Sequence, residues 1–209
     1  MHVLAVNVGA PREIQTPNGR VVRTAIFKHP VEGRVRVAGV NLAGDDQADR
    51  SVHGGPDKAV YAYASEDTAW WSAERGTELG PGAFGENLTT AGVDVSGAVL
   101  GERWAVGTTL LEVCQARMPC FKLGLRMGDP TFVKTFGLAG RPGAYLRILR
   151  EGDVGADDAV EVLDRPDHGI TIAAMAHVFL RDRARLPDLL AAPALPQDWR
   201  DWIAERAVS

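Results

Sequence analysis

The sequence predicts a mainly β protein that ends in a small group of helices. Short apolar or alternating runs dominate residues 1–166, and clusters of Gly, Pro or Asp separate them. This is the pattern of an all-β sandwich or barrel. After the segment DRPDHG the spacing of apolar residues changes to the helical period. We therefore expect a β domain over residues 1–166 and a three-helix extension over residues 167–209.

The segments that read as strands are short. They include HVLAVNV, VVRTAIFK, GRVRVAGVNL, AVYAYA, ERWAVG, TTLLEVCQ, AYLRILREG and AVEVLD. In the third of these, Val35 and Val37 alternate with arginines, as a strand with one buried face requires. Two segments within the β domain have helical character instead. SEDTAWWSAERG is expected to form a helix that Ser65 caps and Gly76 stops, and DPTFVKTFG a further short helix.

The extension is expected to contain three short helices. Thr171 is a suitable N-cap for the first of them. Prolines then divide the segment, and a second apolar stripe at helical spacing follows. The members of that stripe are Trp199, Trp202, Ile203 and Ala207. A unit of this size is too small to be stable alone, so we expect it to pack against the β domain.

The composition is that of an ordinary globular protein. Hydrophobic residues make up 45% of the chain, charged residues 24%, and the net charge is −4. The mild acidity argues against binding to a nucleic acid polymer, but a mildly acidic protein can still contain a local basic pocket. No apolar run approaches the ~20 residues that span a bilayer, and the N-terminus lacks the basic start of a signal peptide. We expect a cytoplasmic protein that does not bind membranes.

The densest group of polar residues lies in QADRSVHGGPDKAVYAY, residues 47–63. It combines His53, Asp57 and Lys58 with two glycines directly before an apolar strand. The glycines allow the backbone to approach a ligand closely, and backbone N–H groups beside Lys58 suit an anion such as phosphate. A tight turn with an exposed lysine and a hydrogen-bonded histidine explains the same residues, so both interpretations stay open.

Three other segments supply polar residues at strand ends. In GAFGENLTT, Glu86 and Asn87 stand at a strand entry. Two interpretations stay open: their side chains bind a ligand, or they form hydrogen bonds with nearby backbone groups. Lys28 ends a strand and reads by itself as an ordinary surface residue. In RPGAYLRI, Arg141 adds a basic side chain or belongs to a plain turn.

Both cysteines lie in the segment VCQARMPCFKLGL, and their surroundings differ. Cys114 sits within an apolar strand, where a thiol is normally buried and inert. Cys120 follows Pro119 and stands between Arg117 and Lys122. Positive charge favours the thiolate, which attacks electrophiles or binds soft metals, whereas a thiol packed under a loop is the alternative. One cysteine cannot make a zinc site, so a metal bound here would bring its other ligands as a cofactor.

Four motifs in order resemble a MOSC domain, the module named after the C-terminal domain of molybdenum cofactor sulfurase. They are DRSVHGGPDKAVYAY, FGENLTT, QARMPCFKL and RPGAYLRI. The tail after residue 166 is similar to the three-helix extension of a bacterial subgroup, the 6-hydroxylaminopurine resistance type. The resemblance covers nearly the whole chain. It implies a MOSC-type β-barrel with a few short helices and a bound molybdenum cofactor, in which molybdopterin holds the metal and bears a phosphate.

The resemblance also implies roles for the site residues. Cys120 would ligate molybdenum through its thiolate. The basic residues that would neutralise the phosphate and the anionic metal centre are Lys28, Lys58, Arg117 and Arg141. The residues that would line the pocket are His53, Asp57, Glu86 and Asn87. Among them His53 is the best candidate for proton donation, because the unperturbed pKa of histidine lies near neutrality.

The reaction implied is the reduction of N-hydroxylated compounds, such as hydroxylaminopurines, hydroxylamines and amidoximes, as a detoxification. The chain has no flavin fingerprint and no cysteine set for an iron–sulfur cluster, so a partner protein would have to supply the electrons. A flavoprotein is the natural hypothesis for that partner. Two alternatives stay open: a cofactor-handling or sulfur-carrier module with a persulfide on Cys120, and a β-barrel binding module with an inert thiol. Trp199 and Trp202 cover either the barrel or a second subunit, so a homodimer also stays open.

Overall fold

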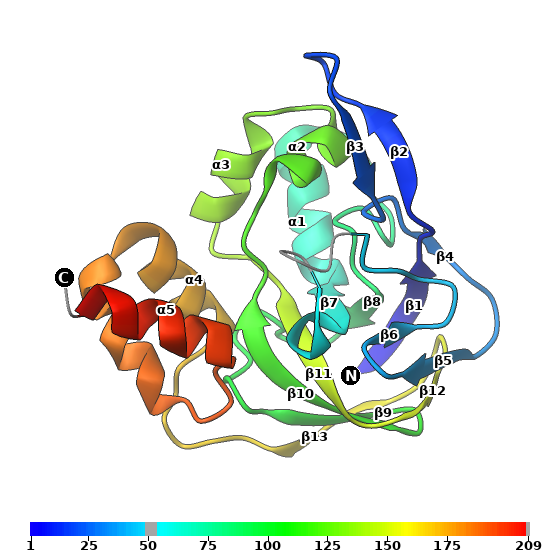
Figure 1. Cartoon of the computed structure of the whole chain (residues 1–209). Coiled ribbons are helices and arrows are strands. Elements are labelled where there is room, and N and C mark those ends of the chain that lie inside the picture. The colour runs from blue at the N-terminus through cyan, green and yellow to red at the C-terminus, as the bar shows by residue number, and fades with distance from the viewer. Residues whose placement is uncertain (49–53, 208–209) are drawn as a thin grey trace.

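The computed structural model describes residues 1–48 and 54–207, and its centre is an eight-stranded sheet (Figure 1). The strand order is β13-β9-β10-β11-β7-β8-β1-β4. In chain order the strands are β1 (His2–Val8), β4 (His29–Pro30), β7 (Val60–Ala64), β8 (Leu88–Ala91), β9 (Arg103–Val106), β10 (Thr109–Ala116), β11 (Ala144–Arg150) and β13 (Val160–Asp164). Neighbouring strands are antiparallel except β7 and β8, which are parallel. The predicted mainly β architecture is therefore confirmed.

The sheet is not the closed barrel that the resemblance implied. Its ladders end at β13 and β4. The two sides approach at a single bridge between His2 and Ala159, beside a 2.9 Å hydrogen bond from the backbone N–H of Val3 to the carbonyl of Asp158. The chain turns directly before this bridge, where Asp157 adopts a φ of 67°. Because this turn interrupts the extended backbone, only a few groups can align with β1 and the ladder does not continue.

Strand β7 is buried on both faces, which explains why its sequence VYAYA contains no charged residue. Val60, Ala62 and Ala64 belong to the main apolar core. Tyr61 and Tyr63 point to the other face and belong to a second, aromatic cluster. The alternation of side chains along the strand thus separates two cores, and the face that carries Tyr61 also borders the candidate site.

Two smaller sheets flank the main one. Strands β5 (Val35–Ala38), β6 (Asn41–Leu42) and β12 (Gly152–Val154) form the first, and the hairpin of β2 (Arg12–Gln15) and β3 (Val21–Thr24) forms the second. The hairpin projects from the molecule at the top of Figure 1. In β5 the two valines are buried and the arginine between them is exposed, so the predicted alternation is confirmed.

Three helices pack on the aromatic side of β7 (Figure 1). They are α1 (Ser65–Arg75), α2 (Phe121–Met127) and α3 (Phe132–Leu138). Helices α1 and α3 were predicted, and α1 ends at Gly76, whose φ of 61° is the left-handed geometry that glycine favours. Ser65 is the first helical residue rather than the cap, because Ala64 occupies the N-cap position. Helix α2 was not predicted, and it places residues 121–127 beside the candidate site.

The C-terminal segment forms the three predicted helical elements, α4 (Ile172–Arg181), η2 (Arg183–Ala191) and α5 (Gln197–Ala207). Thr171 caps α4 as predicted, since its hydroxyl accepts a 3.1 Å hydrogen bond from the backbone N–H of Ala174. Element η2 contains Pro187 and is a 3₁₀ helix. Residues of all three elements share one buried cluster with the main sheet, so the extension has no core of its own. Across the described residues, no helix combines the length and apolar character needed to cross a membrane.

Candidate functional site

A cavity with about 110 Å³ of space accessible to water lies beside β7 and opens to solvent. Its walls come from the segment before β4, the loop after β6, the start of β7, the segment before β8 and the segment between β10 and α2. The polar residues that line it are Thr24, Lys28, Asn41, Asp45, Asp46, Gln47, Lys58, Tyr61, Asn87, Arg117, Cys120, Lys122 and Tyr145. Segments far apart in the sequence therefore assemble one site.

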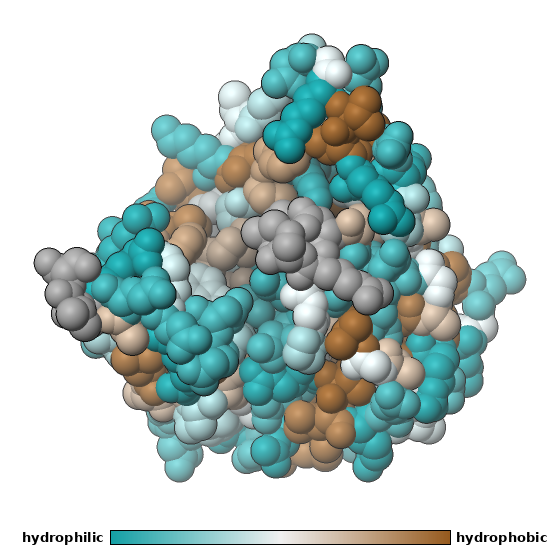
Figure 2. Space-filling model, in the orientation of Figure 1, coloured by the Kyte–Doolittle hydropathy of each residue, from teal (hydrophilic) through white to brown (hydrophobic). Residues whose placement is uncertain are grey.

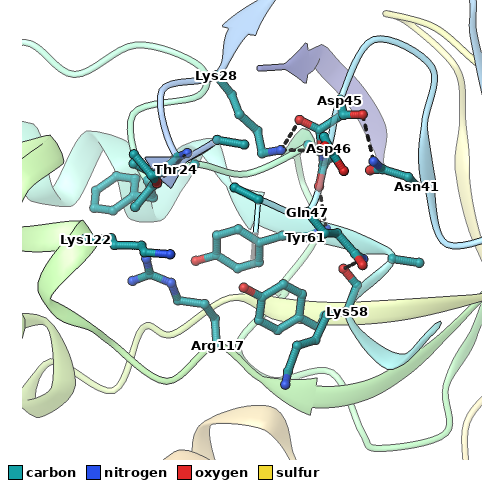
Figure 3. Close-up of a pocket in the computed structure, with 18 of the residues that line it drawn as sticks. Thr24, Lys28, Asn41, Asp45, Asp46, Gln47, Lys58, Tyr61, Arg117 and Lys122 are labelled. Atoms are coloured by element: carbon teal, nitrogen blue, oxygen red, sulfur yellow. Dashed lines mark hydrogen bonds and ion pairs between the residues drawn. The ribbon is translucent and has the colours of Figure 1, made fainter. Parts of the chain in front are cut away.

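One side of the cavity is basic. Figure 3 shows Arg117, directly after β10, and Lys122, from α2, close together at one side of the Tyr61 ring. Lys58, from η1 (Pro56–Lys58), lines the same cavity and lies apart from them in this view. Arg117 is 4% exposed, and its guanidinium lies 5.4 Å from the ring centroid of Phe136. Among the described residues, no acceptor reaches its buried Nη1 atom. Leaving a buried donor unpaired costs free energy, so this side of the cavity is suited to an anionic ligand.

The opposite side is closed by a buried ion pair between Lys28 and Asp45 (Figure 3). The carboxylate of Asp45 also accepts hydrogen bonds from the backbone N–H of Gly9, at 2.9 Å, and from Nδ2 of Asn87, at 2.8 Å. Burial lowers the pKa of Lys28, and the charge of Asp45 opposes that shift. Lys28 and Asn87, both predicted as cofactor-binding residues, therefore line the cavity and are held by Asp45, a residue that the sequence analysis did not select.

Cys120 lines the cavity and is half-buried, directly before α2. Cys114 lies inside β10, where its thiol donates a 3.0 Å hydrogen bond to the carbonyl of Asp57. Burial raises the pKa of Cys114 far above the usual range of a thiol. The two cysteines thus differ as expected in their surroundings, and among the described residues Cys120 is the only thiol that borders the cavity.

Glu86, predicted as a cofactor-binding residue, is fully buried beneath the cavity wall. Its carboxylate accepts hydrogen bonds from the backbone N–H groups of Gly82 and Phe84, at 2.6 and 3.0 Å, and from the hydroxyl of Thr89, at 2.8 Å. Burial raises the pKa of Glu86, and these hydrogen bonds oppose that shift. Glu86 stabilises the turn before β8 and does not line the cavity.

Two more predicted residues make contacts away from this cavity. The carboxylate of Asp57 forms a 2.8 Å ion pair with Arg147. Arg141 pairs with Asp67, and its guanidinium lies 4.7 Å from the ring centroid of Trp70. Neither Asp57 nor Arg141 therefore lines the cavity that contains Arg117 and Cys120.

The glycine turn before η1 is hydrogen-bonded to Gln47 of the cavity wall, and His53 of the same motif lies outside the described residues. Gly55 has a φ of 98°, which requires the glycine that the sequence analysis singled out. Gln47 holds the turn through its side chain, which donates to the carbonyls of Gly55 and Lys58 and accepts from the N–H of Gly55. Gln47, Tyr61 and Tyr145 were not predicted as site residues. The two tyrosines lie in apolar strands, where a tyrosine reads as a core residue.

A second cavity, with about 460 Å³ of space accessible to water, adjoins the first. It lies between the end of β10 and the C-terminal helices, and the residues common to both cavities are Lys58, Met118, Cys120 and Tyr145. Phe179 from α4 and Trp199 and Trp202 from α5 form its far wall. Cys120 therefore stands where a basic cavity meets an aromatic one.

Comparison with known proteins agrees with this architecture. The family model described as MOSC domain matches residues 49–161, more than half of the chain. The chain is 34% identical over 201 residues to the Uncharacterized protein YflK of Bacillus subtilis, covering 95% of this chain and 90% of that one. It is 32% identical over 193 residues to Protein YiiM of Escherichia coli, with 89% of this chain and 85% of that one covered.

Two further matches concern fold and activity. The crystal structure of YiiM from Geobacillus stearothermophilus superposes with a TM-score of 0.80 at 31% identity, covering 98% of both chains. A Gibberella moniliformis protein named Reductase is 34% identical over 152 residues, which are 71% of this chain and 27% of that protein. The likeness to YiiM thus extends over the C-terminal helices as well as the sheet.

Proposed function

Because this chain belongs to the MOSC domain family, whose members are associated with the molybdenum cofactor, we propose that it binds that cofactor and reduces N-hydroxylated compounds. The observation that carries the proposal is the position of Cys120, a half-buried thiol on the wall of a cavity whose neighbouring wall is basic. A soft thiolate next to fixed positive charge suits an anionic metal cofactor.

The residues present fit such a group. The buried guanidinium of Arg117 has a donor that no described acceptor satisfies, and a phosphate or another anionic oxygen would satisfy it through a charge-assisted hydrogen bond. Lys58 and Lys122 line the same cavity and add positive charge. Cys120 would supply one protein ligand to molybdenum. Asp57, Glu86 and Arg141, whose contacts lie elsewhere, are not included in this binding set.

The overall reaction converts R–NHOH, two protons and two electrons into R–NH₂ and water. The bound cofactor supplies the two-electron chemistry, and a flavoprotein is the proposed source of electrons. The chain orients the substrate and provides protonated groups. Tyr145 lines both cavities, and its hydroxyl is protonated at neutral pH because the pKa of a phenol lies near 10 and burial raises it further. Tyr145 can therefore donate a hydrogen bond to the substrate oxygen, and His53 remains the candidate for proton transfer proposed from its sequence motif.

The comparisons support an oxidoreductase in general terms. The fungal relative is named Reductase, and the region that matches this chain is 27% of that protein. Reduction of N-hydroxylated substrates by this chain is our proposal, and it extends beyond what that name states.

The test uses protein produced in a host that makes molybdopterin. Molybdenum content and reduction of 6-hydroxylaminopurine with an artificial electron donor are measured for the wild type, Cys120→Ser and the matched control Cys114→Ser. We expect Cys120→Ser to lose most of its molybdenum and its turnover, and Cys114→Ser to keep both. Equal molybdenum and turnover in all three would contradict the proposal. Cyanide-labile sulfur on Cys120 without any reduction would favour the sulfur carrier instead.

A further inference from the structure

The outer side of helix α2 has no role in the chemistry described so far. Phe121, the first residue of α2, is 49% exposed, and Leu125, one turn later on the same side of the helix, is half-buried. Figure 2 shows hydrophobic residues, in brown, open to solvent over α2 and the hairpin of β2 and β3, with hydrophilic residues around them. Aromatic side chains with a polar surround are enriched in protein–protein contacts, so this side of α2 is a candidate docking surface.

Two arginines border the exposed side of α2. The guanidinium of Arg12, in β2, lies 3.8 Å from the ring centroid of Phe27, and that of Arg126, in α2, lies 5.3 Å from the same centroid. In the part of the chain that the structure describes, neither arginine forms an ion pair. Burial lowers the pKa of Arg126, the charge of Glu86 opposes that shift, and the charge of Arg12 lowers the pKa further. Two like charges held beside one ring attract an anionic partner.

Positive charge is concentrated in the two segments that form this surface. Residues 117–142 contain five basic residues and one acidic residue, and residues 12–28 contain four basic residues and one acidic residue. Ion pairs neutralise two of these cations, Lys28 and Arg141. The whole chain carries a net charge of −4, so the remainder of the chain is strongly acidic. An acidic protein is therefore repelled by the remainder and directed toward this surface.

The surface begins at the residue next to Cys120. Consecutive Cα atoms are about 3.8 Å apart, so a protein that covers Phe121 comes within one residue of the thiol that lines both cavities. Lys122, the residue after Phe121, is buried and lines the first cavity. The first turn of α2 thus connects the outer surface with the candidate site.

We propose that the surface formed by Arg12, Phe27, Phe121, Leu125 and Arg126 docks the acidic face of the protein that supplies electrons to this site. The inference rests on the proposed function, because it takes the site at Cys120 as the destination of those electrons. Each turnover takes two electrons from the donor's reduced flavin, which is oxidised, while R–NHOH and two protons become R–NH₂ and water. Basic charge steers the donor, and the exposed aromatic ring forms the apolar centre of the contact.

Binding to cofactor-free protein tests the surface without any chemistry. The probe is flavodoxin, a small acidic flavoprotein, titrated at about 0.01 M ionic strength, where exposed charges act over about 30 Å. We expect the wild type to bind flavodoxin, and Arg12→Glu to bind it about tenfold more weakly or worse. Arg12→Lys keeps the charge and should retain most of the affinity. Phe121→Ala should bind about fivefold more weakly, because it removes the apolar centre of the contact.

The matched controls are exposed residues outside the docking surface. Arg185→Glu replaces an arginine of η2 whose side chain is 62% exposed, and Leu163→Ala truncates a leucine of β13 that is 60% exposed. Both should bind like the wild type, and circular dichroism establishes that every variant is folded. Failure of the wild type to bind flavodoxin, or equal affinity in wild type, Arg12→Glu and Phe121→Ala, would overturn the assignment of this surface. A loss of affinity in Arg185→Glu equal to that in Arg12→Glu would overturn it as well.

Kinetics then separates this inference from the proposed function. Reduction of 6-hydroxylaminopurine by cofactor-loaded wild type and Arg12→Glu is measured with reduced flavodoxin and with reduced methyl viologen, a small cationic dye that a basic surface does not attract. We expect Arg12→Glu to lower kcat/KM for flavodoxin about tenfold or more and to leave the rate with the dye unchanged. Equal rates of the two proteins with flavodoxin refute the docking surface and leave the reductase intact. Flavodoxin binding that depends on Arg12, in a protein that turns over with neither donor, refutes the reductase and leaves the surface.

Discussion

The buried pair of Lys28 and Asp45 allows a quantitative test of what holds the site together. The side chains of Lys28 and Asp45 are 8% and 4% exposed. Asp45 accepts hydrogen bonds from the ammonium of Lys28, the N–H of Gly9 and the amide of Asn87, so it joins the wall segments of Lys28 and Asn87 to the segment of Gly9. Replacing Asp45 with Asn removes the charge and preserves the shape. The ammonium of Lys28 then remains buried without a counter-charge.

Removing one partner of a buried ion pair costs about 3–5 kcal/mol, because the remaining charge is uncompensated. We expect Asp45→Asn to lose this amount of unfolding free energy. Lys28→Met should cost less, since the carboxylate of Asp45 keeps its hydrogen bonds from Gly9 and Asn87. The double variant should be more stable than the sum of the two single effects predicts, with a coupling of about 1–3 kcal/mol.

The assay is urea denaturation of wild type, both single variants and the double variant, followed by circular dichroism. The matched control is Asp188→Asn, which breaks a surface pair with Arg185 whose side chains are 55% and 62% exposed. Such a pair contributes about 0–1 kcal/mol. If the effects at Lys28 and Asp45 add within about 0.5 kcal/mol, or if Asp45→Asn costs no more than the surface control, the reasoning about the buried pair is wrong.

Two further predictions concern buried charge. Arg117→Met should leave the thermal stability of the cofactor-free protein unchanged or raised, because it removes a buried cation with an unsatisfied donor. After cofactor loading, the molybdenum content of the variant should be at least about tenfold lower than that of the wild type. Burial raises the pKa of Glu86 above its usual 4.5, so its contribution to stability is fully present below pH 4.5 and is lost as the pH rises through the folded pKa. The unfolding free energy of the wild type minus that of Glu86→Gln should therefore decrease as the pH rises through that window.

Each of these predictions has an outcome that contradicts it. A marked destabilisation of cofactor-free Arg117→Met would show that its guanidinium is satisfied within the protein, and undiminished molybdenum would remove Arg117 from the binding set. For Glu86, urea denaturation is repeated between pH 4 and 8. A stability difference between wild type and Glu86→Gln that grows in favour of the wild type as the pH rises would mean that hydrogen bonds outweigh burial and lower its folded pKa.

Local sequence was sufficient wherever a property depends on a few neighbouring residues. The alternation in β5, the stop of α1 at Gly76 and the cap of α4 at Thr171 follow from short-range geometry and appear in the structure. The contrast between Cys114 and Cys120 is of the same kind, because a strand residue and a residue after proline have different surroundings whatever the rest of the fold does.

Contacts between distant segments could not be read in this way. Asp45 lies in a polar loop whose sequence does not indicate that it holds Lys28 and Asn87. Glu86 and Arg141 resembled ligand-binding residues, but the fold supplies each with partners inside the protein. A charged side chain binds whichever partner the folded chain brings within reach, and the local sequence does not contain that information.

Short-range patterns in the sequence predict the class of the fold, the helical tail and the different surroundings of the two cysteines. Packing of distant segments brings particular basic residues into one cavity with Cys120, and it makes the tail one wall of a second, aromatic cavity beside it. The hydrogen bond between Trp199 and Gln115 joins residues 84 positions apart. Secondary structure follows from short-range periodicity, whereas a site depends on side chains that meet only after the chain has packed.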